Sequence, residues 1–236
     1  DPGVDVIVAE APADPDALAS LADLLDESER ARAANYRSDD ARCVFTLARG
    51  LLRREAGARL GAPPGSVRFR LLPSGKPELE HSAADARRLR FSVSHTGRFA
   101  ALAFAWDVGV GLDIEGSSRV VQPLQIASRY FHEDEMRALT SLPAERRVLS
   151  FLAGWTRKEA IVKARGSTMA ESLTSLAVDL NPEAVHPAAK DDVPGRAACA
   201  LTTLRFASIP LIGAVAVTGE HPANVTLRVL SAPAFD

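Results

Sequence analysis

The feature of this 236-residue sequence that most constrains its fold is a repeated change in the spacing of apolar residues. Short β-branched runs alternate with longer stretches in which apolar residues recur every three or four positions. We predict strands at residues 4–10, 67–72, 91–94, 100–106, 108–114, 176–178, 198–207, 212–217 and 225–230. Helices are expected near residues 14–25 and at 38–60, 122–130, 133–139 and 143–164. This order favours an α+β fold over a doubly wound parallel sheet.

The element order suggests two similar α+β halves, residues 1–107 and 108–236, each with an antiparallel sheet and packed helices. We expect them to form a pseudo-twofold monomer, although no residue-level repeat supports a duplication. The middle strands fit an antiparallel meander, a turn is expected at residues 73–77, and residues 181–196 look like a loose loop.

Composition excludes several classes of protein. Lys and Arg total 28 against 30 Asp and Glu, a formal charge of -2, so neither nucleic acid nor an anionic membrane is an expected partner. No run approaches the roughly 18 apolar residues of a membrane helix, and the first residues do not resemble a signal peptide. Two cysteines give no disulfide framework. Cytoplasmic is the default, but residue 1 is Asp, so a native start and its targeting signal could have been removed.

The end of one predicted strand carries two acids. Asp113 and Glu115 stand two residues apart in Val-Gly-Leu-Asp-Ile-Glu, so period two places both on one face. Carboxylate oxygens are the ligands that Mg²⁺ prefers. The alternative is an exposed strand end with two ordinary acids.

A predicted helix carries a second group of polar residues. Trp155, Glu159 and Lys163 follow one another at intervals of four and form one ridge. The alternative is a surface ion pair between Glu159 and Lys163, worth about 0.3 to 0.5 kcal/mol, with Trp155 in the core.

Together these segments resemble the signature of the 4'-phosphopantetheinyl transferases, Gly-[Ile/Leu/Val]-Asp followed by [Phe/Trp]-[Ser/Cys/Thr]-x-Lys-Glu-[Ala/Ser]-x-x-Lys. This chain has Gly-Leu-Asp at 111–113 and Trp-Thr-Arg-Lys-Glu-Ala-Ile-Val-Lys at 155–163. Gly-Lys-Pro at 75–77, Phe-Ser-Val-Ser-His-Thr-Gly at 91–97 and Arg-Tyr-Phe at 129–131 resemble the surfactin-synthetase-activating (Sfp-like) branch. The likeness spans roughly residues 28 to 180.

The resemblance implies a reaction. Coenzyme A donates its 4'-phosphopantetheine arm to a serine of an apo acyl, polyketide or peptidyl carrier protein, and adenosine 3',5'-bisphosphate leaves. Asp113, Glu115 and Glu159 would hold Mg²⁺, or Mn²⁺ in its place, and Lys163 would stabilise the departing phosphate. The sequence does not choose between Glu159 and a metal-bound water as the base.

The resemblance also implies residues that contact coenzyme A, namely Lys76, Ser94 and His95. Arg42 and Arg49, on a basic helix, could meet its 3'-phosphate, because the forked guanidinium suits phosphate. For His95 the alternative is an ordinary surface or core histidine, and for each arginine it is a solvated helix face. The carrier would dock near Ile126, Phe131 and Met136, at least half of which are expected in the core.

Two other readings of the sequence stay open. A catalytically silent homologue that binds coenzyme A or a carrier protein would show a broken acid set or no lysine, and neither is seen. A two-carboxylate metal phosphohydrolase would need further Asp or His ligands at strand ends, where only Asp107 and His95 are nearby.

Overall fold

The computed structural model describes residues 2–72, 76–80, 87–167 and 173–231. The predicted turn at residues 73–77 lies partly outside them, at 73–75. The strands are β1 (Gly3–Glu10), β2 (Phe69–Leu71), β3 (Pro77–Leu79), β4 (Leu89–Thr96), β5 (Phe99–Trp106), β6 (Val110–Gly116), β7 (Leu176–Val178), β8 (Ala189–Asp191), β9 (Cys199–Leu204), β10 (Leu211–Thr218) and β11 (Asn224–Leu230). The α-helices are α1 (Ala19–Asp23), α2 (Glu27–Ala34), α3 (Asp39–Leu60), α4 (Pro123–Tyr130), α5 (Glu133–Ser141) and α6 (Ala144–Arg165), with 3-10 turns at Pro15–Leu18 and Pro64–Ser66.

The two main sheets repeat one topology. The first has the order β11-β1-β5-β4 and the second β6-β10-β9, so β1, β5 and β4 correspond to β6, β10 and β9. In each half the first strand leads into helices, of which the last, α3 or α6, is the longest, and the chain then returns through the other two strands. This arrangement confirms the predicted α+β fold with pseudo-twofold halves. Strand β11 pairs with β1 in parallel, whereas the pairs within each repeated unit are antiparallel.

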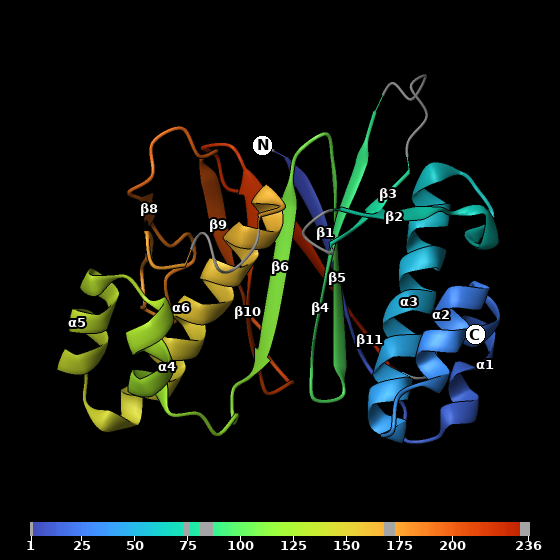
Figure 1. The fold of residues 1–236 in the computed structure, drawn as a ribbon, viewed down its shortest axis with the longest axis horizontal. Coiled ribbons are helices and arrows are strands. Elements are labelled where there is room, and N and C mark those ends of the chain that lie inside the picture. Colours follow the sequence, from blue (N-terminus) through green and yellow to red (C-terminus); the bar gives the residue numbers. More distant parts are fainter. Residues whose placement is uncertain (1, 73–75, 81–86, 168–172, 232–236) are drawn as a thin grey trace.

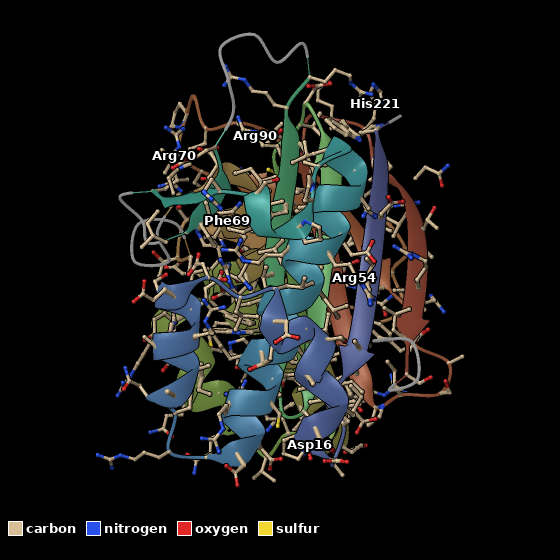
Figure 2. The ribbon with its side chains drawn as sticks, turned by 90° about the vertical axis from the view of Figure 1, so that its right-hand side faces the viewer. Asp16, Arg54, Phe69, Arg70, Arg90 and His221 are labelled. Atoms are coloured by element: carbon tan, nitrogen blue, oxygen red, sulfur yellow. The ribbon has the colours of Figure 1, made fainter. Side chains whose placement is uncertain are left out.

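The layers run helix, sheet, sheet, helix. In Figure 1, α1–α3 lie at the right and α4–α6 at the left, with the strands between them. In Figure 2, seen from the side of α1–α3, these helices lie in front of the first sheet. One apolar cluster joins α3 to the first sheet, a second lies between the two sheets, and a third joins α6 to the second sheet. Each sheet therefore buries both faces.

Local signals in the sequence set the ends of the two long helices. The Ser38 hydroxyl accepts the amide proton of Ala41 at the start of α3. The helix ends at Gly61, where φ is 64°, and α6 ends in the same way at Gly166, where φ is 68°. Glycine adopts this left-handed conformation without a steric penalty, which explains both helix ends.

The predicted antiparallel meander is wrong at its third strand. Strands β4 and β5 pair, but β6 leaves β5 and pairs with β10 of the other sheet. Asp107, at φ 65°, stands in the connection between β5 and β6. Crossing over lets Val110, Leu112 and Ile114 pack against the first sheet, where they bury more apolar surface than at its edge.

Three short elements lie where the sequence predicted none. Helix α2 starts with a capping box formed by Asp26 and Glu29, β3 pairs with β2, and β8 pairs with β7 inside the predicted loose loop. Arg53 of α3 is only 1% exposed, because Glu29 of α2 and a backbone carbonyl satisfy its guanidinium. The short α2 therefore turns part of the basic face into an interior contact.

The division at residues 107/108 stays a prediction. Strand β11 belongs to the second segment of the chain but extends the sheet of the first. Within the part of the chain that the structure describes, no helix is both long and apolar enough to cross a membrane.

Candidate active site

The site is built where α6 crosses the second sheet at close range. Gly111, Asp113 and Glu115 occupy every second position of β6 and so lie on one face of it. A Cβ atom on Gly111 would overlap the carbonyl oxygen of Ala160 and come within 2.5 Å of the amide nitrogen of Ala164. On the neighbouring strand, Ala214 pairs with Asp113, and its small side chain packs in the same cluster as α6. Small residues thus bring the helix down onto the strand that carries the acids.

Strand β6 and helix α6 bring four of the predicted residues together. The Lys163 ammonium lies 2.7 Å from Asp113 Oδ1 and 3.1 Å from the carbonyl oxygen of Leu112. Asp113, Glu115 and Glu159 are each less than 9% exposed. The sequence motif therefore corresponds to three buried acids beside one half-buried lysine, and the alternatives of an exposed strand end and a surface ion pair do not hold.

Glu159 is the least satisfied of these acids. Its Oε1 atom is buried and has no hydrogen-bond partner in the part of the chain that the structure describes. Burial raises the pKa of Glu159 to about 7, with the charges of Asp113 and Glu115 adding to the rise and Lys163 opposing it. Burial also raises the pKa of Glu115, against the effects of Thr96 and Arg119.

Two hydroxyl groups on β4 hold the acids of β6. Ser94 Oγ donates to Asp113 Oδ1 at 2.8 Å, and Thr96 Oγ1 donates to Glu115 Oε2 at 2.9 Å. The other oxygen of Glu115 pairs with Arg119. Ser94, predicted to contact a ligand, is thus buried beside Asp113, and Thr96 and Arg119 are site residues that the sequence reasoning missed.

Lys76 contacts the backbone of both elements that carry the site, β6 and α6. Its ammonium donates to the carbonyl oxygen of Lys163 at 2.5 Å and to that of Val110 at 3.3 Å. Burial lowers the pKa of Lys76 to about 8, helped by the charges of Arg90 and Lys163. A pocket opens beside it, and its lining includes Leu72, Lys76, Arg90, Asp107, Gly109 and Arg165. Lys76 therefore links this pocket to the acids through the backbone of α6.

The donor set fits a hard divalent cation in its chemistry. The candidate ligands are carboxylate oxygens from two elements, and one of them is a buried oxygen with no hydrogen-bond partner among the described residues. As the side chains stand, however, no three His, Cys, Asp or Glu residues among those described enclose a metal position. Lys163 and Arg119 neutralise Asp113 and Glu115 instead.

Comparison with known proteins decides the family. A sequence model of the 4'-phosphopantetheinyl transferase superfamily matches residues 109–201, and a model of a 4'-phosphopantetheinyl transferase N-terminal region matches residues 11–106. A 4'-phosphopantetheinyl transferase of Nostoc sp. is 35% identical over 165 residues, which are 70% of this chain and 69% of that protein. The chain belongs to the 4'-phosphopantetheinyl transferase superfamily. This confirms the family predicted from the motifs.

Other transferases of the family match more distantly. One from Bacillus pumilus is 31% identical over 156 residues, covering 66% of this chain and 64% of the relative. The human L-aminoadipate-semialdehyde dehydrogenase-phosphopantetheinyl transferase is 28% identical over 139 residues, or 56% of this chain and 45% of that protein. The matched region thus covers 64% of the length of the first of these relatives and 45% of the length of the second.

Among the residues expected to contact coenzyme A, two arginines pair with acids of the chain and one histidine is exposed on β4. Arg49 donates to Glu29 at 2.6 Å and its guanidinium lies 4.7 Å from the ring centre of Phe69. Arg42 is exposed and pairs with Asp39. His95 is exposed on the face of β4 opposite to Ser94. The roles of Arg42, Arg49 and His95 in binding stay predictions.

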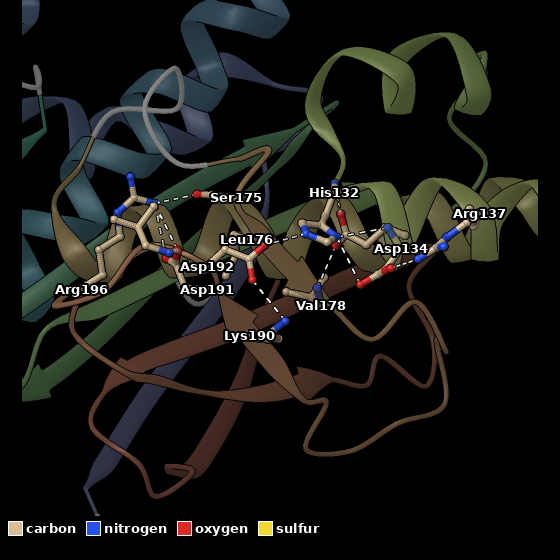
Figure 3. Close-up of polar contacts among 12 residues, drawn as sticks. His132, Asp134, Arg137, Ser175, Leu176, Val178, Lys190, Asp191, Asp192 and Arg196 are labelled. Atoms are coloured by element: carbon tan, nitrogen blue, oxygen red, sulfur yellow. Dashed lines mark hydrogen bonds and ion pairs between the residues drawn. The ribbon is translucent and has the colours of Figure 1, made fainter.

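One lysine of the transferase signature has a structural partner. Lys158, next to Glu159, is 0% exposed and its ammonium contacts a carboxylate oxygen of Glu135 and the carbonyl oxygen of Leu176. Glu135 also accepts the amide protons of His132 and Val178, and Figure 3 shows the contacts around these two residues. Lys158 therefore fixes α6 to α5 and β7. Lys163 differs from it in both burial and partner, because its side chain is 27% exposed and pairs with Asp113.

Proposed function

We propose that the chain transfers the 4'-phosphopantetheine group from coenzyme A to a serine hydroxyl of an apo carrier protein and releases adenosine 3',5'-bisphosphate. The observation that carries this proposal is the partly buried contact between Lys163 and Asp113 beside the buried Glu159, formed by the signature residues of the family. A catalytically silent homologue is not favoured, because the acid set and the lysine are both intact.

The chemistry assigns a task to each residue. The serine oxygen forms a new bond to the phosphorus of the pantetheine arm, and the pyrophosphate P–O bond breaks. The serine proton needs an acceptor, which would be either the Glu159 carboxylate or a metal-bound water. Lys163 would neutralise the negative charge that develops on the leaving phosphate. The pocket beside Lys76 is the proposed place for the nucleotide part of coenzyme A.

We further propose that Asp113, Glu115 and Glu159 hold Mg²⁺, with Mn²⁺ as a substitute. When bound, the ion would supply a positive charge for the phosphate oxygens. The unpartnered oxygen of Glu159 supports this assignment, since a buried oxygen without a donor is unusual. A monomeric state, a cytoplasmic location and the absence of nucleic-acid or membrane partners stay predictions.

The proposal is tested by intact-mass spectrometry. The protein is incubated with coenzyme A and Mg²⁺ and, in separate reactions, with apo acyl, polyketide and peptidyl carrier proteins. We expect a mass gain of one phosphopantetheine on at least one carrier and none on that carrier after its serine is changed to alanine. Release of adenosine 3',5'-bisphosphate without any mass gain would instead indicate a hydrolase.

Variants then test the assigned roles. Asp113→Asn, Glu159→Gln and Lys163→Met are expected to lower turnover by about 100-fold or more while the protein stays folded. Lys190→Met is a matched control, because Lys190 is an exposed lysine in a surface ion pair with Asp192. A variant of the first set that keeps near-full turnover would remove that residue from the mechanism.

A further inference from the structure

Strands β4 and β6 lie side by side but belong to different sheets. Hydroxyl groups at every second residue of β4 join them. Ser92, Ser94 and Thr96 accept the backbone amide protons of Leu112, Ile114 and Gly116, at 3.0, 3.3 and 3.3 Å. We call these three residues the hydroxyl seam. It takes the place that a backbone ladder has within a sheet.

Each hydroxyl of the seam also has one proton of its own to donate. A hydroxyl group has a single proton, and a backbone amide can only donate, so each oxygen accepts from the amide and its own proton points elsewhere. Ser94 gives that proton to Asp113, and Thr96 gives it to Glu115. At Ser92 the equivalent position on β6 is Gly111, which has no side chain. The seam thus has two positions that face an acid and one that does not.

The hydrogen bond from Thr96 fixes one oxygen of Glu115. The other oxygen pairs with Arg119, whose side chain is 52% exposed. Solvent can replace an exposed guanidinium, whereas Thr96 lies on a strand held from both sides by β5 and β6. The hydroxyl therefore keeps Glu115 in one orientation whether or not Arg119 remains.

We propose that Thr96 and Ser94 are positioning residues that orient Glu115 and Asp113 for binding a divalent cation, while Ser92 only joins the two sheets. This inference rests on the proposed function. A hydrogen-bond donor behind a ligating carboxylate sets the orientation of that ligand, and its loss commonly weakens metal binding by about 10- to 100-fold.

The test measures Mn²⁺ binding directly by electron paramagnetic resonance, without coenzyme A or a carrier. Thr96→Val keeps the shape of the side chain and removes the hydroxyl, Thr96→Ser restores it, and Ser92→Ala removes a hydroxyl that faces no acid. Thermal unfolding of the metal-free proteins reports the structural effect, which we expect to be similar for Thr96→Val and Ser92→Ala, because each leaves one β6 amide without its partner.

We expect Thr96→Val to weaken Mn²⁺ binding about tenfold, Thr96→Ser to stay within about twofold of the wild type, and Ser92→Ala to leave the affinity unchanged. Equal affinities for Thr96→Val and the wild type, or equal losses in Thr96→Val and Ser92→Ala, would overturn the inference. If the wild-type protein binds no Mn²⁺, the metal assignment and this inference both fail, whereas the mass-spectrometric assay judges the transfer reaction separately.

Discussion

Glu159 is a residue whose pKa burial and neighbouring charges shift strongly. The residue is 7% exposed, and the charges of two other acids act on its carboxyl group. In the folded protein its pKa is about 7, against an ordinary value of 4.5. The folded state therefore holds a proton that the unfolded state loses first, and folding becomes less favourable as the pH rises between these values.

This leads to a prediction for Glu159→Gln in metal-free protein. The amide cannot ionise, so the variant lacks the free-energy cost of ionising a buried Glu159. In the wild type this cost is absent below about pH 4.5 and complete above about pH 7, where it amounts to at most about 3 kcal/mol. We expect the free energy of unfolding of the variant, relative to the wild type, to increase by about 2 kcal/mol between pH 5 and pH 8. Urea unfolding in the presence of a chelator measures it, and a difference that does not change with pH would contradict the assignment.

At the scale of elements, the close approach of α6 to β6 depends on Gly111. The glycine of the family motif has an ordinary negative φ, so backbone freedom does not explain it. Its role is space, because the backbone of α6 occupies the place of a Cβ atom. The same approach brings Lys163 within 2.7 Å of Asp113.

Gly111→Ala is therefore expected to destabilise the protein by roughly 2 to 3 kcal/mol, as overpacking of a tight contact does, and to reduce turnover by moving α6 away from the acids. Gly116→Ala is the matched control on the same strand, since a Cβ atom there meets nothing within 4 Å, and its effect should stay within about 0.5 kcal/mol. Chemical unfolding of both variants provides the comparison. Similar stabilities would show that α6 can move without loss.

At the scale of the whole molecule, neither predicted half is complete by itself. Val4, Val6 and Val8 of β1 face the second sheet across the central apolar cluster. The edge of β1 is covered by β11, which comes from the end of the chain. The two halves therefore share a core and a strand.

We predict that a fragment of residues 1–107 aggregates or stays unfolded when expressed alone, because it exposes one apolar sheet face and the edge of β1. Co-expression with residues 108–236 should restore a folded complex. Circular dichroism and size-exclusion chromatography test both statements, with the full chain as reference. A monomeric fragment 1–107 with a cooperative unfolding transition would show that the first half is an independent domain.

Much of this protein could be predicted from sequence because it depends on local signals. Periodicity, the Ser38 cap and the glycines at positions 61 and 166 gave the long helices and most of the strands. Short elements such as α2 and β8 were missed, since their few residues carry little periodic signal and packing against neighbours stabilises them. The crossover of β6 was also missed, because the burial of its apolar face depends on a sheet formed by distant segments.

For the site, the sequence by itself determined which residues were proposed for the chemistry, namely Asp113, Glu115, Glu159 and Lys163, because their spacing on a strand and a helix is local and matches a family signature. Only the tertiary structure decided what surrounds them. It buries Lys158 against Glu135 but leaves Lys163 on Asp113, and it brings the hydroxyl of Thr96 to Glu115 from a strand of the other sheet. The physical reason is that burial and hydrogen-bond partners depend on which segments approach each other in space, and spacing along one element does not contain that information.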